Sequence, residues 1–175
     1  FEGFVDFVMT RWKQFPDLHI YHYAPYEPGA MKRLMGRYAT REEEIDQMLR
    51  AGLFVDLYTV TRQGVRASVE SYSIKKLEPF YGFTRETDLS DANKALSVLQ
   101  ANLELDDIPS ITEASKAVVR SYNKDDCHST VYLRDWLEAL RTQLINDGED
   151  VPRPEPGEGS PNETITDWLI KIRGL

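Results

Sequence analysis

The sequence contains a single cysteine, Cys127, among its 175 residues. One cysteine cannot form a disulfide within the chain, and this favours a reducing, cytoplasmic location. Long hydrophobic runs are also missing, because no apolar stretch approaches the roughly 20 residues that a membrane-spanning helix needs. The sequence therefore excludes a disulfide-stapled secreted fold and predicts a cytoplasmic protein that does not enter a membrane.

An excess of positive charge is missing too, since the formal net charge is −8. Contacts to nucleic-acid phosphates require Lys and Arg, so this balance argues against a protein that is basic throughout. The charge is unevenly distributed, however. Residues 60–85 carry five basic and two acidic side chains, whereas residues 86–113 carry seven acidic side chains and one lysine. A basic strip on an acidic body is compatible with nucleic-acid contacts or with an ordinary solvated surface.

The composition, with 41% hydrophobic and 29% charged residues, suits one globular domain with its own core. We expect an α/β domain over residues 1–148, and a linker rich in Pro, Gly and acidic residues over 149–163. A following helix or domain is expected to start within 164–175. Because the chain opens with Phe1 directly in a helical pattern, we also expect it to be a fragment of a longer protein.

Hydrophobic periodicity predicts helices interleaved with short strands, the arrangement typical of a layered α/β fold. Capping boxes, in which a Ser or Thr and a Glu three residues later pair with backbone N–H groups, are expected at Thr40 and Ser110. The predicted elements are an amphipathic helix over 1–15, strands over 18–23 and 53–60, a helix beginning at Pro28, helices over 40–51, 73–77 and 91–104, and a long helix from Ser110 to about Ile145.

One acidic residue of the long helix lies on its apolar stripe. The stripe runs at spacings of three and four residues through Val119, Tyr122, Asp126, Ser129 and Leu133. Burying a lone carboxylate is costly, so such a group is usually paired or bound to a metal. Two interpretations of Asp126 stay open: a partly exposed carboxylate bridged to an Arg, or a metal ligand with Tyr122 poised beside it.

Two further carboxylates lie near predicted strands. Glu27 follows the strand 18–23 and precedes Pro28, so it is either a ligand at a strand end or a partner of the helix N-terminus. Asp56 lies within LFVDLYTV and is either a ligand or an acceptor for backbone N–H groups. Phosphodiester hydrolysis by two Mg²⁺ or Mn²⁺ ions needs several carboxylates converging from different elements, because these metals prefer oxygen ligands.

Three longer strings carry a family resemblance: YHYAPYEPGAMKRL (21–34), VDLYTVTRQGVRASVESYSIKKLEPFYGF (55–83) and SYNKDDCHSTVYLRDWLEALR (121–141). They resemble the ribonuclease H-like exonuclease domain of the DEDDy type that occurs in predicted RecB-family nucleases, which are often fused to helicases. The resemblance implies a mixed sheet flanked by helices, of which the N-terminal strands are expected to be missing here. It also implies Mg²⁺ or Mn²⁺ as cofactor and 3′–5′ exonuclease activity on nucleic acid, with DNA preferred to RNA.

The resemblance assigns roles to individual residues. The third motif, Tyr-x-x-x-Asp, falls on Tyr122 and Asp126, and Glu27 takes the place of the second-motif Asp. Glu27, Asp126 and Asp56 are the predicted metal ligands. The first motif, Asp-x-Glu, is expected upstream of Phe1, because the only such pattern here is Asp147 to Glu149 in a hydrophilic tail. The fragment alone is therefore expected to be inactive.

Four basic residues are the predicted nucleic-acid contacts, with ordinary surface side chains as the alternative: Lys75, Lys76, Arg62 and Arg66. The expected function is a metal-dependent nuclease module of DNA repair or processing. The main alternative is a catalytically inactive domain that binds nucleic acid or acts as a scaffold beside a helicase. A third possibility is a protein-interaction module unrelated to DNA.

Overall fold

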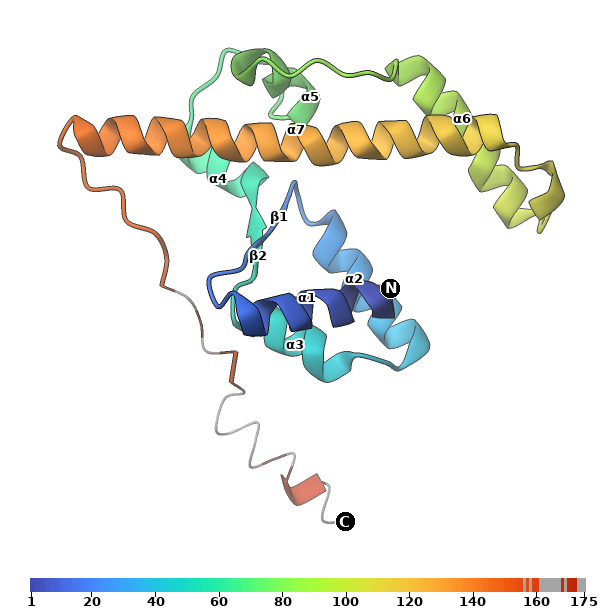
Figure 1. Cartoon of the computed structure of the whole chain (residues 1–175), viewed down its shortest axis with the longest axis horizontal. Helices are drawn as coiled ribbons and strands as arrows, with labels where there is room; N and C mark the ends of the chain where they lie inside the picture. The colour runs from blue at the N-terminus through green and yellow to red at the C-terminus, as the bar shows by residue number, and fades with distance from the viewer. Residues whose placement is uncertain (156, 158, 161–167, 169, 173–175) are drawn as a thin grey trace. The chain divides into compact units, whose positions relative to one another are not determined.

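A computed structural model describes residues 1–155, 157, 159–160, 168 and 170–172 of the chain, which are mainly helical (Figure 1). They form two compact units, Phe1–Val60 with Leu144–Leu175, and Thr61–Gln143, and each unit is described by itself. Most of the predicted segment 164–175, and part of the predicted linker 149–163, lie outside the described residues. The predicted boundaries of the domain, the linker and the following segment therefore stay predictions.

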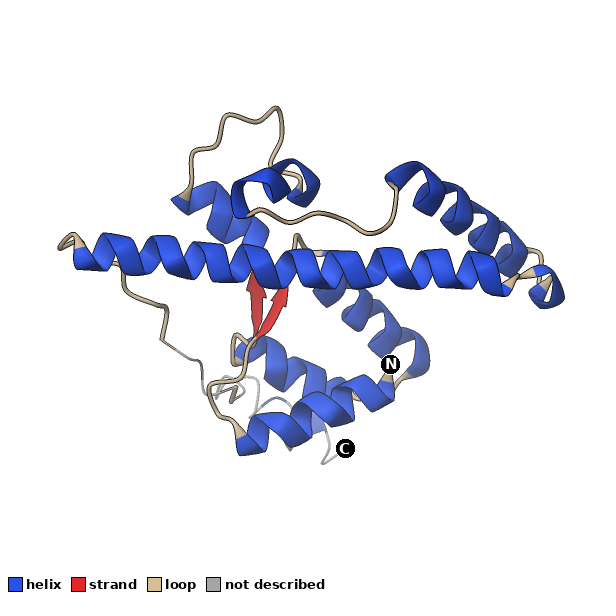
Figure 2. Ribbon diagram, turned by 45° about the horizontal axis from the view of Figure 1, so that its top comes forward, coloured by secondary structure: helices blue, strands red, loops and turns tan. Residues whose placement is uncertain are grey.

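The first unit contains a small parallel sheet. Its elements are α1 (Glu2–Gln14), β1 (Ile20–His22), α2 (Tyr26–Tyr38), α3 (Glu42–Arg50) and β2 (Phe54–Asp56). The two strands lie side by side with Ile20 opposite Phe54 and His22 opposite Asp56 (Figure 2). Parallel neighbours need a long crossover connection, which α2 and α3 supply here. The structure thus confirms an α/β chain that is mostly helical and compatible with a ribonuclease H-like fold.

The core of the first unit lies between α1 and α3. Val5 and Val8 of α1 are buried with Ile45 and Met48 of α3. These pairs recur at spacings of three residues, so each helix presents one apolar face and the two faces meet. Ala51 and Leu53, which lead into β2, complete the same cluster. The strands begin beside this core, since Ile20 and Phe54 pack against it.

Three predictions for the first unit are corrected. The helix predicted from Pro28 begins at Tyr26, so Glu27 lies in its first turn and does not precede it. The capping box at Thr40 is absent, because Arg41 is the N-cap in a left-handed conformation and Thr40 Oγ1 donates to Glu2 instead. The strand predicted over 53–60 ends at Asp56, where α4 (Leu57–Gly64) begins.

The second unit is built around one long helix, α7 (Glu113–Asn146), which belongs to this unit as far as Gln143. Before it come α5 (Ile74–Leu77), the 3-10 turn η1 (Glu78–Tyr81), α6 (Leu89–Glu104) and the 3-10 turn η2 (Ile108–Ser110). In both ribbon views α5 lies along the middle of α7 and α6 lies near its beginning (Figures 1 and 2).

The segment between α5 and α6 turns sharply at Gly82. This residue has a φ of +68°, which favours glycine, and its N–H group bonds to the carbonyl of Glu78. The turn directs the segment from Phe83 to Asp88 back toward α7, where Thr87 bonds to Asp125. A correction applies to the start of α7 as well: Ser110 lies in η2, and the helix is capped by Thr112, whose Oγ1 accepts a bond from the Ser115 N–H group.

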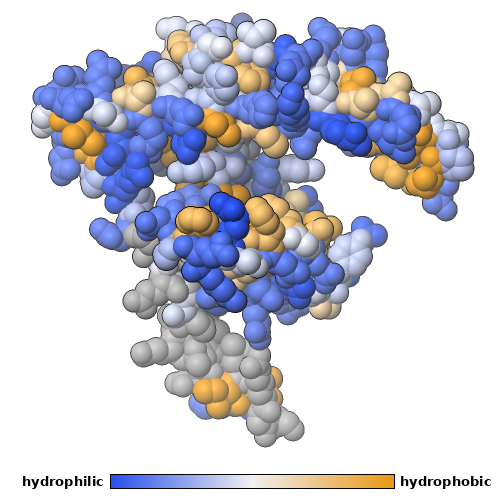
Figure 3. Space-filling view, in the orientation of Figure 1, coloured by the Kyte–Doolittle hydropathy of each residue, from blue (hydrophilic) through white to orange (hydrophobic). Residues whose placement is uncertain are grey.

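The exposed residues of the described chain include large hydrophobic side chains such as Phe7, Tyr26 and Leu105. The face drawn in Figure 3 is mostly hydrophilic, interrupted by separate hydrophobic patches. Within the described part of the chain, no helix combines the length and the apolar character needed to cross a membrane.

Candidate functional site

The two neighbouring carboxylates of α7 have different environments. Asp125 is only 2% exposed, and its Oδ2 accepts a hydrogen bond of 3.0 Å from the Thr87 N–H group. The Asp126 side chain is 40% exposed. Asp125, Ser129 and Leu133 are the buried residues of the helix and follow one another at four-residue spacing. The buried face of α7 therefore includes Asp125, whereas the sequence analysis predicted that Asp126 lies on that face.

Asp126 is paired with an arginine. The Nη1 of Arg85 lies 2.8 Å from Asp126 Oδ1. This is the geometry that the first interpretation of Asp126 predicts, a partly exposed carboxylate bridged to an Arg. The role of Asp126 as a metal ligand stays a prediction.

Arg85 also holds a second carboxylate, that of Glu78. Its Nε lies 2.9 and 3.1 Å from the two Glu78 oxygens, and its Nη2 lies 2.6 Å from Oε1. Glu78 is itself buried. Burial lowers the pKa of Arg85, but hydrogen bonds and charge from Glu78 and Asp126 outweigh it, so its pKa is raised above the ordinary value. Arg85 is therefore a fixed cation between two carboxylates.

The Glu78 carboxylate is tied to α7 through two hydroxyls. Ser129 Oγ donates to Glu78 Oε1 at 2.9 Å, and the hydroxyls of Ser129 and Tyr81 lie 2.9 Å apart. The pKa of Tyr81 is raised to about 12, chiefly by burial and also by the nearby Glu78 charge, against the opposing effects of the Ser129 hydrogen bond and Arg85. This network links η1, the segment after Gly82 and α7 through polar groups that are all satisfied.

Tyr122 lies one helical turn before Asp126 and is contacted by a lysine. Lys75 Nζ donates to Tyr122 Oη at 2.6 Å and lies 5.1 Å from the centre of the ring. The Arg85 guanidinium carbon lies 5.4 Å from the same ring centre. Two cations thus contact the tyrosine of the predicted third motif. Lys75 was predicted to contact nucleic acid, and the structure shows that it is already engaged with Tyr122.

The other predicted nucleic-acid contacts lie at the surface. Lys76 is 56% exposed along its side chain and its Nζ lies 3.6 Å from Glu70. Arg62 and Arg66 are exposed as well. Each of the three is accessible to a large ligand, and their role in binding stays a prediction.

An open pocket of about 510 Å³ lies in the second unit beside this network. Lys75, Glu78 and Arg85 form part of its wall, and the segment after Gly82 forms most of the remainder. The other lining residues are Pro79, Phe83, Thr84, Glu86, Thr87 and Asp88. The pocket therefore brings together charges of both signs and is not a cradle for anions alone.

The predicted ligand Asp56 lies in the first unit and is surrounded by donors. Its Oδ1 accepts from the N–H groups of Ala24 at 2.8 Å and Tyr58 at 3.0 Å, and its Oδ2 accepts from Thr59 Oγ1 at 2.7 Å. Ala24 has a φ of +63°, so its bond to Asp56 stabilises an uncommon conformation. Asp56 caps α4, as expected of a structural acceptor.

Glu27 also lies in the first unit, in the first turn of α2, where a negative charge interacts favourably with the helix N-terminus. Its side chain is 50% exposed, and its Oε2 lies 3.8 Å from Nδ1 of the buried His22. The same His22 nitrogen lies 2.7 Å from the Ala24 carbonyl oxygen. Glu27 is thus accessible and makes one long ionic contact, whereas Asp56 accepts three hydrogen bonds.

Carboxylate oxygens such as those of Glu27, Asp56 and Asp126 are ligands that Mg²⁺ and Mn²⁺ prefer. Among the described residues there is no group of three or more His, Cys, Asp or Glu side chains that could hold a metal ion. Asp126 carries an arginine on one oxygen, and both oxygens of Asp56 accept hydrogen bonds. The only Asp-x-Glu pattern, at Asp147 and Glu149, is exposed. Neither unit, taken by itself, gathers a two-ion centre from its described residues.

The sequence did not identify the residues at the centre of this site. Glu78, Arg85 and Asp125 were considered only as surface charges or not at all. Arg85 and Glu78 form the buried ion pair of the site, and buried Asp125 accepts a hydrogen bond from the Thr87 N–H group. One signal was present: Glu78 is enclosed by apolar neighbours in IKKLEPFYGF, where a lone acid needs a partner. Nothing in the sequence pairs Glu78 with Arg85 in particular.

Comparison with known proteins supplies one match. A family model described as the RNase H superfamily matches residues 2–138, well over half of the chain. No curated protein and no solved structure matches the chain significantly. The match covers parts of both units and includes every predicted site residue.

Proposed function

The chain belongs to the RNase H superfamily, and on that premise we propose that it is a nuclease module acting as a metal-dependent 3′–5′ exonuclease. Family membership supports hydrolysis of nucleic-acid phosphodiester bonds as the general activity. The finer assignment depends on the resemblance to DEDDy-type exonuclease domains. DNA is the proposed substrate, and a RecB-type nuclease and a helicase are the proposed fused or associated partners.

The observation that best supports this proposal is the environment of Tyr122 and Asp126. They lie four residues apart on α7, so both side chains extend from the same side of the helix. Lys75 fixes the Tyr122 hydroxyl, and Arg85 fixes one oxygen of Asp126. Both functional groups are therefore held in defined positions by basic side chains, as the proposed roles in water activation and metal binding require.

In this proposal Tyr122 orients or helps to deprotonate the attacking water, and Asp126 and Glu27 are metal ligands. Mg²⁺ or Mn²⁺, when bound, would stabilise negative charge on the phosphate oxygens. Carboxylates additional to Glu27 and Asp126 are required, because the described residues do not complete a metal site. Lys76, Arg62 and Arg66 remain the proposed contacts to the nucleic-acid backbone.

A second candidate is a domain that binds nucleic acid without cleaving it. One observation favours this alternative: Arg85 already neutralises Asp126, and Asp56 is used as a structural acceptor. A domain that has lost catalysis would still retain the basic strip and the fold. Both candidates predict nucleic-acid binding that weakens with salt, so the test has to measure cleavage.

The test uses the natural full-length protein with single-stranded DNA labelled at either end, in the presence of Mn²⁺. Stepwise shortening from the 3′ end is expected. Asp126→Asn should lower the rate at least about a hundredfold, because a lost metal ligand removes transition-state stabilisation. Asp135→Asn is the matched control, since Asp135 is an exposed acid of the same helix. DNA binding without cleavage by the unaltered protein would favour the second candidate.

A further inference from the structure

Arg85 contacts Asp126 and Glu78 with three of its side-chain nitrogens. Nη1 contacts Asp126, whereas Nε and Nη2 contact Glu78. The Arg85 side chain is only 8% exposed although it bears a full charge. Guanidinium groups remain protonated at all physiological pH values, so this cation is permanent.

The position of Arg85 is determined by groups on two other elements. Glu78 begins η1 and accepts a bond from Ser129, which is buried in α7. The Tyr81 hydroxyl, which lies next to Ser129, also donates to the Ile74 carbonyl at 3.3 Å. Moving the guanidinium away from Glu78 would leave a buried carboxylate without its cation, which is costly. Arg85 therefore cannot leave the network freely.

The two carboxylate oxygens of Asp126 have different surroundings. Its Oδ1 accepts a hydrogen bond from Arg85, whereas its Oδ2 has no hydrogen-bond partner among the described residues. The side chain is partly exposed. A divalent ion approaching the free oxygen would meet the positive guanidinium bonded to the same carboxylate. Like charges this close repel, and the repulsion is weakly screened because Arg85 is largely buried.

The proposed function needs a divalent ion at Asp126, and the structure shows a guanidinium there. We infer that Arg85 is a resident counter-cation of Asp126, which competes with a divalent ion for this carboxylate and sets the ion affinity of this half of the site. This inference depends on the proposed role of Asp126 as a ligand. In this inference Arg85 is a positioning residue for Asp126, and Glu78 holds Arg85 in place.

The competition can be measured without catalysis. The 175-residue chain is titrated with Mn²⁺, and the free ion is followed by its electron paramagnetic resonance signal. The double variant Glu78→Gln/Arg85→Gln removes both charges together, so that neither remains buried without its partner. Its Mn²⁺ affinity is expected to be about tenfold higher than that of the unaltered chain, because the repulsion is gone.

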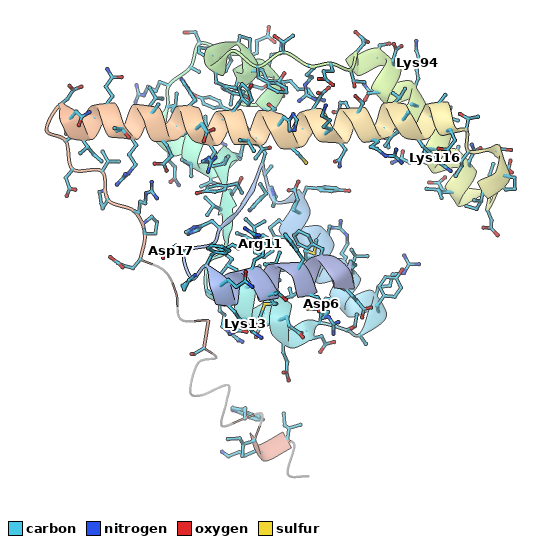
Figure 4. The ribbon with its side chains drawn as sticks, viewed as in Figure 1. Asp6, Arg11, Lys13, Asp17, Lys94 and Lys116 are labelled. Atoms are coloured by element: carbon cyan, nitrogen blue, oxygen red, sulfur yellow. The ribbon has the colours of Figure 1, made fainter. Side chains whose placement is uncertain are left out.

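Three control variants identify the cause of any gain. Arg85→Lys keeps a positive charge beside the two carboxylates and should give a much smaller gain than the double variant. Lys116→Gln removes one positive charge near the beginning of α7, where Lys116 pairs with Glu113, and should change little (Figure 4). Adding Asp126→Asn to the double variant should abolish the gain.

The outcomes separate the inference from the proposed function. Equal Mn²⁺ binding by the double variant with and without Asp126→Asn would refute the ligand role of Asp126, and the inference with it. If Asp126→Asn weakens binding but the double variant shows no gain, only the competition by Arg85 is refuted. A gain in Mn²⁺ affinity that persists when Asp126→Asn is added to the double variant also refutes the competition by Arg85, because the ion would then bind elsewhere.

A second measurement needs no variant and applies even if the double variant fails to fold. Mg²⁺ is added to the unaltered, ¹⁵N-labelled chain, and the Nε–H resonance of Arg85 is observed. Competition requires this resonance to shift in proportion to ion binding, since the bonds of the guanidinium change. A resonance that stays in place while backbone signals around Asp126 shift would overturn the inference.

Discussion

Lys75 Nζ lies 2.6 Å from Tyr122 Oη, so the short helix α5 orients the tyrosine of the long helix α7. This contact makes Lys75 a positioning residue for Tyr122, in addition to any contact that it makes with nucleic acid. The neighbouring Lys76 carries the same charge, but its side chain is exposed to solvent and its Nζ lies near Glu70. The pair therefore offers a comparison of two lysines at adjacent positions.

We expect Lys75→Met to lower the cleavage rate of the full-length protein by about tenfold or more, because small misplacements of a reacting group are costly. Lys76→Met should leave the cleavage rate nearly unchanged and should weaken DNA binding slightly. Rates at saturating DNA are compared with the Michaelis constants of both variants. An equal loss of binding in both variants, with no selective effect on the rate, would show that Lys75 acts only as a phosphate contact.

Ser129→Ala is expected to destabilise the chain by about 1–3 kcal/mol, since it removes a donor from a buried carboxylate. Ser129 Oγ bonds to both Glu78 and Tyr81. Urea unfolding followed by circular dichroism measures the change. Ser97→Ala is the matched control, because Ser97 is an exposed helical serine that bonds only to its own helix at Asn93. Similar losses for the two variants would argue against the buried network.

We expect Tyr81 to make the free energy of unfolding of the chain decrease at alkaline pH. Its pKa in the folded state is raised to about 12 from an ordinary value of 10.0. The unfolded state therefore loses its proton first, and the stabilisation is complete below pH 10 and is lost as the pH rises toward 12. The free energy of unfolding should fall more steeply above pH 10 for the unaltered chain than for Tyr81→Phe. Parallel curves would contradict the raised pKa.

Asp56→Ala is expected to destabilise the chain by about 2–3 kcal/mol, because bonds to a charged acceptor are lost at a helix cap and at a strained residue. The donors are Ala24, Tyr58 and Thr59. Asp17→Ala, at an exposed position of the same unit, should change stability by no more than about 0.5 kcal/mol (Figure 4). Retention of full stability by Asp56→Ala would refute the structural role.

Periodic segments were the most predictable part of the fold. The helix expected over 1–15 and the long helix ending near Ile145 correspond to α1 and α7, because their apolar spacing extends over several turns. Short apolar runs were less informative. The second half of LFVDLYTV forms α4 because Asp56 caps a helix there, and an apolar run of this length fits either type of element.

The motif pair on α7 was found from the sequence, but its surroundings were not. An apolar stripe with steps of three and four residues can pass through Asp125 or Asp126, and only the packing partners decide between them. Thr87 and Glu78 decide here, since they bond to Asp125 and Ser129. Such contacts join residues 38 and 51 positions apart in the chain. Local patterns contain no information on pairs at this separation.

The two buried acceptor and donor groups of α7, at Asp125 and Ser129, have a consequence for how this helix can move. They lie on one line of the helix and bond to separate segments, Thr87 before α6 and Glu78 in η1. Rotating α7 about its axis by one residue, or sliding it by one turn, would break both bonds at once. The helix therefore has a single azimuth and a single axial register in its unit, and Tyr122 and Asp126 share that fixed orientation.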